Sequence, residues 1–441
     1  MKIKIIDKPY REVIKEYEER HEKHKKPKRP NILFRTLMRL LAVPDMLATH
    51  FKVTRIGMDR LKKGQNAFYL MNHSSFIDME IVATLLYPKP FNIVATTDGF
   101  VGKDWLMREI GCIPTKKFVN DVTLIRDVMH ASRKLRSNIV LFPEAGYSFD
   151  GTSTVLPESV GDFVKLLGIP LVMIRTYGAF ARDPLYNNLQ KRKVHVSATV
   201  EYLLSPEEAK TMSGKEIYEL ICRNFSFDSF LWQQKKHIRI DEPFRADGLE
   251  RILYKCPHCM AENATEGHGT TVECSKCGKI YRLDEYGKLE CTDPSCDCEI
   301  PHIPDWYRWE RREVQRELVA GTYSLDIPVD IVVSMDTKHM YNVGSGRLKH
   351  DNTGFHLTSD DGDINYEHKP LASYTVCSDF NFYEIGDVIS FGDAKCLYYC
   401  FPKVPGVSVA KVRLAAEELY KLERARLEAE KAKASEEKPK E

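Results

Sequence analysis

Short apolar runs alternate with segments of helical spacing between residues 65 and 225, and this pattern constrains the fold more than any other feature. Short runs bounded by turn residues indicate strands, and the longer periodic segments between them indicate helices. Such an alternation predicts an α/β fold in which a mixed sheet is flanked by helices. The expected strands are AFYLMN, FNIVATT, NIVLFPE, IPLVMIR and VHVSATVEYL, and the expected helices lie near 77–87, 121–136, 158–167 and 205–225.

The chain has 441 residues, too many for one ordinary core, so several domains are expected. We expect a basic, amphipathic helical region over 1–64 and the α/β domain over 65–235. A small cysteine-rich module over 251–300 and a β-rich domain over 320–430, closed by a C-terminal helix, would follow. Short strands closed by one helix resemble a pleckstrin-homology-type barrel, and a generic antiparallel sheet with a helix fits the pattern nearly as well.

The strand AFYLMN ends at Asn72 and is followed by His73-Ser-Ser-Phe-Ile-Asp78. Catalytic groups of open α/β sheets gather at the carboxyl ends of strands. A neutral imidazole can take a proton from a hydroxyl, and a carboxylate on its other nitrogen would orient the ring. The same residues also fit a helix cap, because Ser75-x-x-Asp78 is a capping-box variant. The segment alone leaves both interpretations open.

Three later segments favour the catalytic interpretation. They are Gly111-Cys-Ile-Pro-Thr-Lys-Lys117, Phe142-Pro-Glu-Ala-Gly-Tyr-Ser148 and Ile169-Pro-Leu-Val172. Together with Asn72–Asp78, and in this order, they resemble the four motifs of the PlsC-like glycerolipid acyltransferases, the 1-acyl-glycerol-3-phosphate acyltransferase family. The resemblance covers about residues 30–225.

The resemblance implies an enzyme of phospholipid biosynthesis. It would move a fatty acyl group from acyl-CoA or acyl carrier protein to a lysophospholipid hydroxyl, with 1-acyl-glycerol-3-phosphate as the family's acceptor. His73 would be the general base and Asp78 its orienter, with no organic cofactor beyond the acyl donor. The family's second and third motifs hold the acceptor phosphate, which makes substrate-binding candidates of Lys116, Lys117, Glu144 and Gly146.

Two departures from the family pattern weaken the predicted phosphate site. Ala145 and Tyr147 stand where the third motif has glycine and arginine, and Lys117 stands where the second motif has arginine. Arginine binds phosphate through two donors, whereas lysine offers a point charge and tyrosine one neutral hydroxyl. Arg175 is a candidate replacement. An acyltransferase with another acceptor and a lipid-binding scaffold without activity therefore stay open as alternatives.

The cysteines predict a structural metal site. Seven of the twelve fall between Cys256 and Cys298, which is typical of a metal site in a reducing compartment. Two Cys-x2-Cys pairs supply four thiolates at the spacing of a zinc ribbon, and such a closed shell is structural. The expected zinc ligands are Cys256, Cys259, Cys274 and Cys277. Reduced thiols are the simpler interpretation of Cys291, Cys296 and Cys298, with a second metal site including His302 as the alternative.

The N-terminal region is basic and includes a leucine-rich helical pattern. Residues 1–63 carry 18 Lys/Arg and 8 Asp/Glu. Leu33, Leu37, Leu40 and Leu41 recur at helical spacing between Pro30 and Pro44. This pattern predicts either a helix lying in the membrane interface, with Arg35 and Arg39 toward anionic lipid, or an ordinary surface helix docked on its own domain. No apolar run is long enough to span a bilayer, and no secretory signal is evident.

We therefore expect a cytoplasmic protein, peripheral at the cytoplasmic face of the membrane. The basic arm and the zinc ribbon are also compatible with nucleic-acid binding, but no basic and aromatic residues are interleaved on a recognisable module. No nucleic-acid partner is expected.

Overall fold

The structure is a computed structural model that describes residues 3–20, 24–119, 121–293, 295 and 297–436. The chain forms two compact units. Unit 1 comprises Met1–His21, Lys117–Asn120 and Tyr307–Glu441, and unit 2 comprises Glu22–Lys116 and Asp121–Trp306.

A seven-stranded sheet forms the centre of unit 2, in the order β2-β8-β7-β3-β6-β4-β5. Neighbouring strands are parallel except for β7 and β8, so the predicted mixed sheet is confirmed. The strands are β2 (Lys52–Ile56), β3 (Phe68–Met71), β4 (Phe91–Thr96), β5 (Cys112–Thr115), β6 (Asn138–Leu141), β7 (Leu171–Tyr177) and β8 (Ser197–Leu204).

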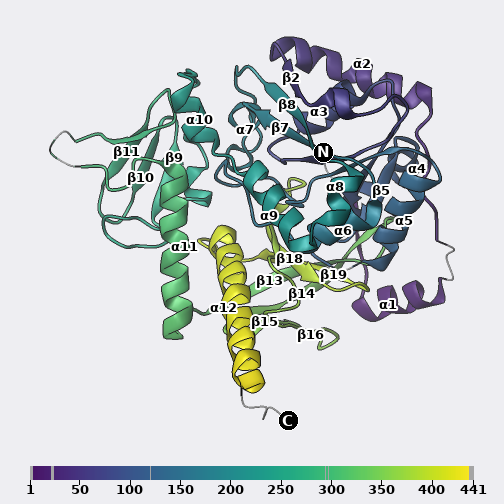
Figure 1. Ribbon diagram of the computed structural model, residues 1–441. Helices are drawn as coiled ribbons and strands as arrows, with labels where there is room; N and C mark the ends of the chain where they lie inside the picture. The colour runs from purple at the N-terminus through teal and green to yellow at the C-terminus, as the bar shows by residue number, and fades with distance from the viewer. Residues whose placement is uncertain (1–2, 21–23, 120, 294, 296, 437–441) are drawn as a thin grey trace. The chain divides into compact units, whose positions relative to one another are not determined.

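Both faces of this sheet are covered by helices (Figure 1). Side chains alternate between the two faces of a strand. In β3, Tyr69 and Met71 therefore pack into one core, and Phe68 and Leu70 into the other. The first core includes α2 (Ile32–Ala48) and α3 (Ile77–Leu86), and the second includes α5 (Val122–Arg133), α6 (Ser159–Leu167) and α9 (Gly214–Phe225).

The segment predicted as one helix over 205–225 forms two. They are α8 (Pro206–Thr211) and α9. Ser205 and Ser213 each begin a helix through a capping box, in which serine and a glutamate three residues later satisfy each other's backbone N–H groups. The second box starts a new helix where the periodicity alone predicts continuation. Three shorter helices complete the domain, α4 (Asp104–Glu109), α7 (Ala179–Arg182) and α10 (Ser229–Lys235).

The cysteine-rich segment of unit 2 forms a separate four-stranded antiparallel sheet, in the order β12-β11-β10-β9. It lies beside α10 (Figure 1). The strand pair that follows the second Cys-x2-Cys pair is as expected, and two further strands precede it. The strands are β9 (Thr265–His268), β10 (Thr271–Cys274), β11 (Ile280–Leu283) and β12 (Leu289–Cys291).

Unit 1 is rich in β-structure, as predicted, and ends in a long helix. Seven strands follow one another in the order β16-β15-β14-β13-β19-β18-β17, and β1 pairs in parallel with β14. The pleckstrin-homology resemblance stays a prediction. The strands are β1 (Ile5–Asp7), β13 (Leu325–Ser334), β14 (Met340–Asp351), β15 (Gly354–Ser359), β16 (Asn365–His368), β17 (Cys377–Phe382), β18 (Gly386–Gly392) and β19 (Leu397–Pro402).

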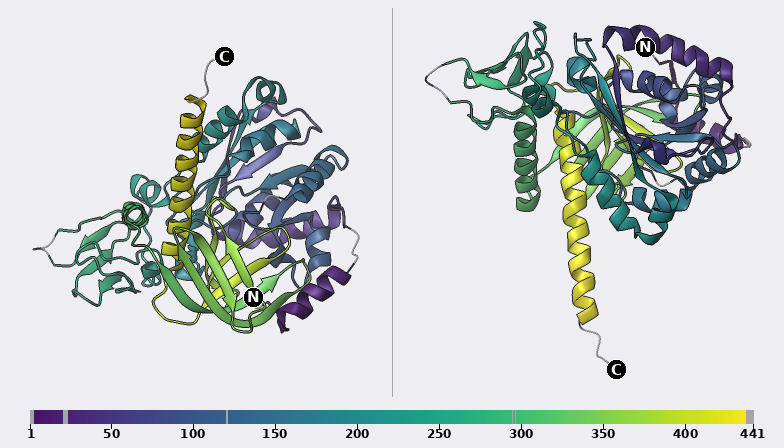
Figure 2. Two further views of the ribbon diagram at one scale, coloured as in Figure 1. Left: turned by 90° about the horizontal axis from the view of Figure 1, so that it is seen from below. Right: turned by 45° about the horizontal axis from the view of Figure 1, so that its top comes forward.

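Among the described residues, three helices belong wholly or partly to unit 1. They are α1 (Tyr10–Glu19), α11 (Ile303–Ala320) and α12 (Val409–Glu436). α11 begins in unit 2 and continues in unit 1, so it is a direct covalent connection between them. The last turns of α12 project beyond the strands of unit 1 (Figure 2). Among the residues that the structure describes, no helix is both long enough and apolar enough to cross a bilayer.

Candidate active site

The parallel strands β3 and β6 bring two of the four predicted motifs together. They are hydrogen-bonded neighbours, so their carboxyl ends lie at the same edge of the sheet. His73 follows β3, and Glu144 follows β6. The backbone N–H of His73 donates to Glu144 Oε2 at 2.7 Å, and the N–H of Ser148 donates to the carbonyl of His73 at 3.1 Å. The first and third motifs therefore form one site.

His73 and Asp78 form a hydrogen-bonded pair. His73 Nδ1 lies 3.0 Å from Asp78 Oδ2. The Asp78 side chain is 1% exposed, whereas 23% of the His73 side chain is exposed. With Nδ1 engaged by the carboxylate, Nε2 is the ring nitrogen that can take a proton from a substrate hydroxyl.

The carboxylate of Asp78 also holds the loop that precedes α3. Its Oδ2 atom accepts the backbone N–H groups of Ser74 at 2.7 Å and Ser75 at 3.1 Å. The helix-cap interpretation is wrong, because the N-cap residue of α3 is Phe76 and no side chain caps this helix. These N–H groups, like that of His73, are already engaged and are poorly suited to stabilise an oxyanion.

Two aromatic rings pack against His73. The Phe142 ring stacks on the imidazole with a centroid separation of 4.2 Å and an interplanar angle of 19°. The Tyr147 ring is tilted by 46° at 4.3 Å. At Tyr147, where the family motif has arginine, this chain therefore places an aromatic ring against the imidazole.

Glu144 braces the loop after β6. It is buried, and its Oε1 atom accepts the N–H of Thr154 at 2.9 Å while Oε2 accepts that of His73. The next residue, Ala145, has a φ of +53°, a left-handed conformation that favours glycine. A Cβ atom at Gly146 would meet nothing within 4 Å. Ala145, which stands at the family's glycine position, therefore has the conformation that favours glycine, and Gly146 does not.

The two predicted lysines lie in different units. Lys116 follows β5, which is separated from β3 by β6 and β4. Three strand spacings place the ends of β5 and β3 about 14 Å apart. Lys117 belongs to unit 1, where its Nζ atom lies 3.3 Å from Cys377 Sγ. Arg175, the candidate replacement, pairs with Glu201 and donates to the carbonyl of Asn224.

Gly111, the first residue of the second motif, has a steric role. Its φ is +95°, and a Cβ atom there would come within 2.7 Å of the Phe91 carbonyl and 2.5 Å of Pro30 Cγ. Glycine is thus required where the chain enters β5 beside β4.

Residues 52–175 match the family model described as "Acyltransferase". This segment is an acyltransferase domain. The match includes all four motifs and confirms the resemblance to PlsC-like glycerolipid acyltransferases. A comparison with curated proteins found no match. A solved structure with some similarity is the 1-acyl-sn-glycerophosphate (LPA) acyltransferase PlsC from Thermotoga maritima. It is 16% identical, and the alignment covers 43% of this chain and 78% of that one with a TM-score of 0.32, too low to carry an argument.

Two polar features of the acyltransferase domain were not predicted from the sequence. Asn72 joins the ends of β3 and β7, because its Oδ1 atom accepts the N–H of Thr176 at 2.8 Å. Arg182 and Asp183, beyond the matched segment, are buried. In the sequence, only the position of Asn72 directly before His73 drew attention to it. An Arg-Asp pair that follows a strand is usually exposed, so the sequence did not predict the burial of Arg182 and Asp183.

The four predicted zinc ligands lie together in the module that follows the acyltransferase domain. One ligand atom from each of the four lies within 4.8 Å of the others. The Sγ–Sγ distances are 3.6 Å for Cys259–Cys274 and 3.9 Å for Cys256–Cys277. A tetrahedron with Zn–S bonds near 2.3 Å has sulfur separations of about 3.8 Å, so these cysteines fit a zinc ion.

The second cysteine cluster is only partly described. Cys291 and Cys298 are half-buried, and Cys296 lies outside the described residues. His302 Nε2 lies 2.9 Å from Asp228 Oδ2 instead. The described residues contain no further group of three or more such ligands.

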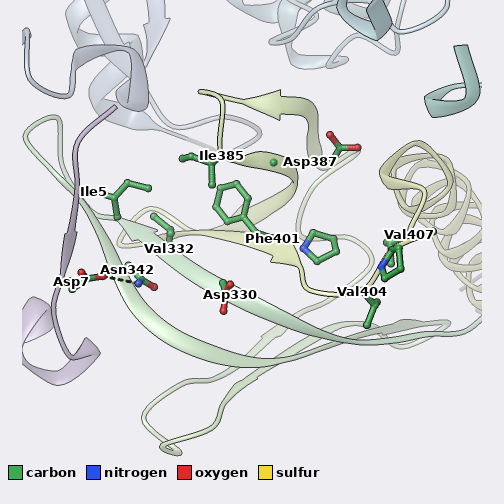
Figure 3. Close-up of a pocket in the computed structure, with 14 residues that line it drawn as sticks. Ile5, Asp7, Asp330, Val332, Asn342, Ile385, Asp387, Phe401, Val404 and Val407 are labelled. Carbon is green, nitrogen blue, oxygen red and sulfur yellow. Dashed lines mark hydrogen bonds between the residues drawn. The ribbon is translucent and has the colours of Figure 1, made fainter. Parts of the chain in front are cut away.

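A separate pocket of about 550 Å³ lies in unit 1 (Figure 3). Its walls combine apolar side chains, including Val332 and Phe401, with the carboxylates of Asp7, Asp330 and Asp387. Asn342 donates to Asp7 at 2.7 Å. None of the predicted catalytic, acceptor or zinc residues lines this pocket.

Proposed function

We propose that this protein transfers a fatty acyl group from a thioester donor to the hydroxyl of a lysophospholipid. The observation that carries the proposal is the His73–Asp78 pair at 3.0 Å inside an acyltransferase domain. His73 Nε2 takes the proton of the acceptor hydroxyl, and the oxygen of that hydroxyl attacks the thioester carbonyl. Collapse of the tetrahedral intermediate breaks the carbon–sulfur bond, and protonated His73 returns the proton to the departing thiolate.

The proposed acceptor class is the lysophospholipids, with 1-acyl-glycerol-3-phosphate as the first member to test. The donor is acyl-CoA or acyl carrier protein. Tyr147 packs against the His73 ring at the position where the family motif has arginine. Without that guanidinium, we expect a phosphate monoester to bind more weakly than the family motif would bind it. Lysophospholipids with larger headgroups are the alternative acceptors. The aromatic contact also keeps a second candidate open, a lipid-binding scaffold without transfer activity.

The decisive experiment incubates the protein with a panel of lysophospholipids and labelled acyl donors, with products identified by mass spectrometry. We expect His73→Ala to abolish transfer without changing the fold or the metal content. His268→Ala is the matched control, since this histidine is 83% exposed and lies in the cysteine-rich module. Near wild-type transfer by His73→Ala would overturn the proposed mechanism, and lipid binding without transfer by the wild type would favour the scaffold.

We also propose that α2 holds the protein on the cytoplasmic face of the membrane. Ala42 and Met46 of α2 are buried in the domain core. The leucines of the predicted stripe are exposed, as are neighbouring apolar residues, so they are not the face that docks on the domain. The arginines support the proposal less than expected, because Arg35 donates to the carbonyl of Pro88. The exposed apolar residues are Ile32, Leu33, Leu37, Leu40, Leu41 and Leu47.

Sedimentation with anionic phospholipid vesicles tests this surface. Replacing Leu37, Leu40 and Leu41 with glutamine should reduce vesicle binding, because apolar area buried in the interface drives such association. Leu166→Gln/Leu231→Gln, on other exposed helices of unit 2, is the control. Equal sedimentation of the α2 variant and the wild type would remove the membrane assignment.

The metal proposed for the four-cysteine site is a structural zinc ion. A closed shell of four thiolates leaves no position for substrate, and a module this small has little core without its metal. Elemental analysis should find one zinc per chain, lost in Cys274→Ser/Cys277→Ser and kept in Cys222→Ser. One zinc per chain in both variants would place the metal elsewhere.

A further inference from the structure

The loop that carries His73 is held by side chains from both sides of β3. Residues 72–76 belong to no helix or strand, so the hydrogen bonds of regular secondary structure do not fix the histidine. In the sheet, β3 lies between β6 and β7. Glu144, after β6, accepts the N–H of His73 at 2.7 Å. On the side of β7, the contact is between Asn72 and Thr176, a residue of that strand.

Thr176 fixes the orientation of the Asn72 amide. Its backbone N–H donates to Asn72 Oδ1 at 2.8 Å, and because a backbone N–H can only donate, the amide oxygen is the atom that faces it. The amide nitrogen, Nδ2, donates to Thr176 Oγ1 at 2.9 Å and to Ser74 Oγ at 2.9 Å. All three residues are buried, so water has little access to replace a contact that is lost.

Ser74 connects this amide to the His73–Asp78 pair. Its backbone N–H donates to Asp78 Oδ2 at 2.7 Å, and the same oxygen lies 3.0 Å from His73 Nδ1. A continuous series of hydrogen bonds therefore leads from β7 to the imidazole. Thr176 lies one position beyond the matched segment, 52–175, and outside the four motifs.

We propose that Thr176 and Asn72 are positioning residues for His73. Acting through Ser74, they hold the imidazole and its carboxylate partner in the geometry that proton transfer needs. This inference rests on the proposed acyl transfer. A general base works only when its nitrogen lies within hydrogen-bond reach of the acceptor hydroxyl, and a displacement of about 1 Å costs on the order of 100-fold in rate. A loop without secondary structure therefore depends on such side-chain contacts.

The first test measures kcat and KM of acyl transfer for Thr176→Val, which keeps the shape of the side chain and removes the hydroxyl. We expect kcat to fall roughly three- to tenfold, because the Asn72 amide loses one acceptor and Ser74 is held less firmly. KM should stay within about twofold of the wild type, since the hydroxyl bonds to Asn72 and not to substrate. Thr176→Ser retains the hydroxyl and should keep kcat within about twofold of the wild-type value.

Thr54→Val is the matched control. Thr54 is an exposed residue of β2, at the edge of the same sheet, and the substitution makes the same exchange of a hydroxyl for a methyl group. It should match the wild type in kcat and KM. An equal fall in kcat for both valine variants would overturn the proposal, because the effect would then not come from the contact with Asn72.

A second measurement does not depend on acyl transfer. Hydrogen exchange of a peptide that contains Ser74 and Ser75 reports how firmly the loop is held, because both backbone N–H groups donate to Asp78. Thr176→Val should raise the exchange of this peptide and leave that of β6 unchanged. Asn72→Ala removes the whole amide, so it should raise loop exchange further and lower kcat roughly 10- to 100-fold. It is the second variant if Thr176→Val does not fold.

The outcomes separate this inference from the proposed function. An unchanged kcat in folded Thr176→Val, or in Asn72→Ala if Thr176→Val does not fold, would overturn the positioning role even if loop exchange rises. A fall in kcat that Thr176→Ser shares would overturn it as well. If the wild type transfers no acyl group, faster exchange confined to the loop would support the restraint from β7 and remove the proposed function, whereas unchanged exchange would remove both.

Discussion

His73 in unit 2 and His350 in unit 1 are held in similar ways. Each ring stacks on a phenylalanine, Phe142 at 4.2 Å and Phe355 at 3.6 Å. Each Nδ1 atom has a hydrogen-bond partner, Asp78 at 3.0 Å for His73 and the hydroxyl of Tyr323 at 2.9 Å for His350. The two sites differ in the charge of that partner and in exposure.

This difference separates a candidate catalytic histidine from a structural one. A carboxylate stabilises the imidazolium, whereas a phenol does not, and 23% exposure of the His73 side chain gives a substrate access to the ring. His350 is 1% exposed, and burial lowers its pKa to about 3. Stacking and an engaged Nδ1 atom are thus common to both roles, and the buried acid with an accessible ring is what indicates catalysis.

The largest effect should come from exchanging the two Nδ1 partners for neutral or non-bonding groups. Asp78→Asn should lower acyl transfer about 10³- to 10⁴-fold, because the amide neither stabilises the imidazolium nor fixes the same tautomer. Tyr323→Phe should leave transfer within twofold and destabilise unit 1 by about 1–2 kcal/mol through the lost buried hydrogen bond. The measurements are steady-state kinetics and hydrogen exchange of β14 and β15. If Asp78→Asn transferred acyl groups within tenfold of the wild-type rate, the carboxylate partner would not be what separates His73 from His350.

The second effect is a loss of stability of unit 1 in acid. Burial lowers the pKa of His350 to about 3 and that of His368 to about 4. The unfolded chain takes up protons below its histidine pKa of about 6.5 while the folded unit does not, so stability falls as the pH decreases from that value toward 4. Each histidine should contribute about 2 kcal/mol of destabilisation between pH 7.5 and 5.0.

His350→Gln isolates this contribution, since glutamine can accept the Tyr323 hydroxyl but does not titrate. Hydrogen exchange of β14 and β15, corrected for intrinsic rates, should show about 2 kcal/mol less acid sensitivity than in the wild type. His268→Gln, at an exposed position, should leave the pH dependence unchanged. Equal acid sensitivity of His350→Gln and the wild type would mean that His350 is not neutral when folded.

The smallest effect should come from the stacked rings. An aromatic pair contributes about 0.5–1.5 kcal/mol beyond its buried area. Phe142→Leu should therefore lower transfer roughly two- to tenfold with little loss of stability, whereas Phe355→Leu should destabilise unit 1 by a similar free energy without affecting transfer. Kinetics and urea unfolding of both variants distinguish these results. A loss of transfer in Phe355→Leu would show that the two histidine sites are coupled.

The strand and helix pattern of the acyltransferase domain could be predicted because buried parallel strands need continuous apolar runs. The four cysteines and the His73–Asp78 pair could also be placed, since their partners are close in sequence or follow a fixed spacing. The predicted helix over 205–225 was divided by a second capping box at Ser213, and α2 continues through Pro44 to Ala48. Local periodicity does not decide such details, because tertiary packing stabilises a helix across an unfavourable residue.

Only contacts across the fold decided the rest of the site. Lys117 follows β5 closely but belongs to unit 1, and Glu144 braces the backbone of His73. Ala145 holds the left-handed conformation that a glycine would normally occupy. Arg182 and Asp183 gave no signal, because a charged pair after a strand is usually exposed, whereas here both are buried and Arg182 pairs with Asp45 on α2.

The sequence by itself determined the mixed α/β domain, the four-cysteine group and the identity of His73 and Asp78 as a pair. Each of these depends on periodicity or on spacing along one segment, which the chain carries locally. The tertiary structure decided that Glu144 contacts the His73 backbone, which aromatic rings pack on the imidazole and which face of α2 stays exposed. Those depend on residues far apart in sequence, since electrostatic interaction and burial follow distance in space.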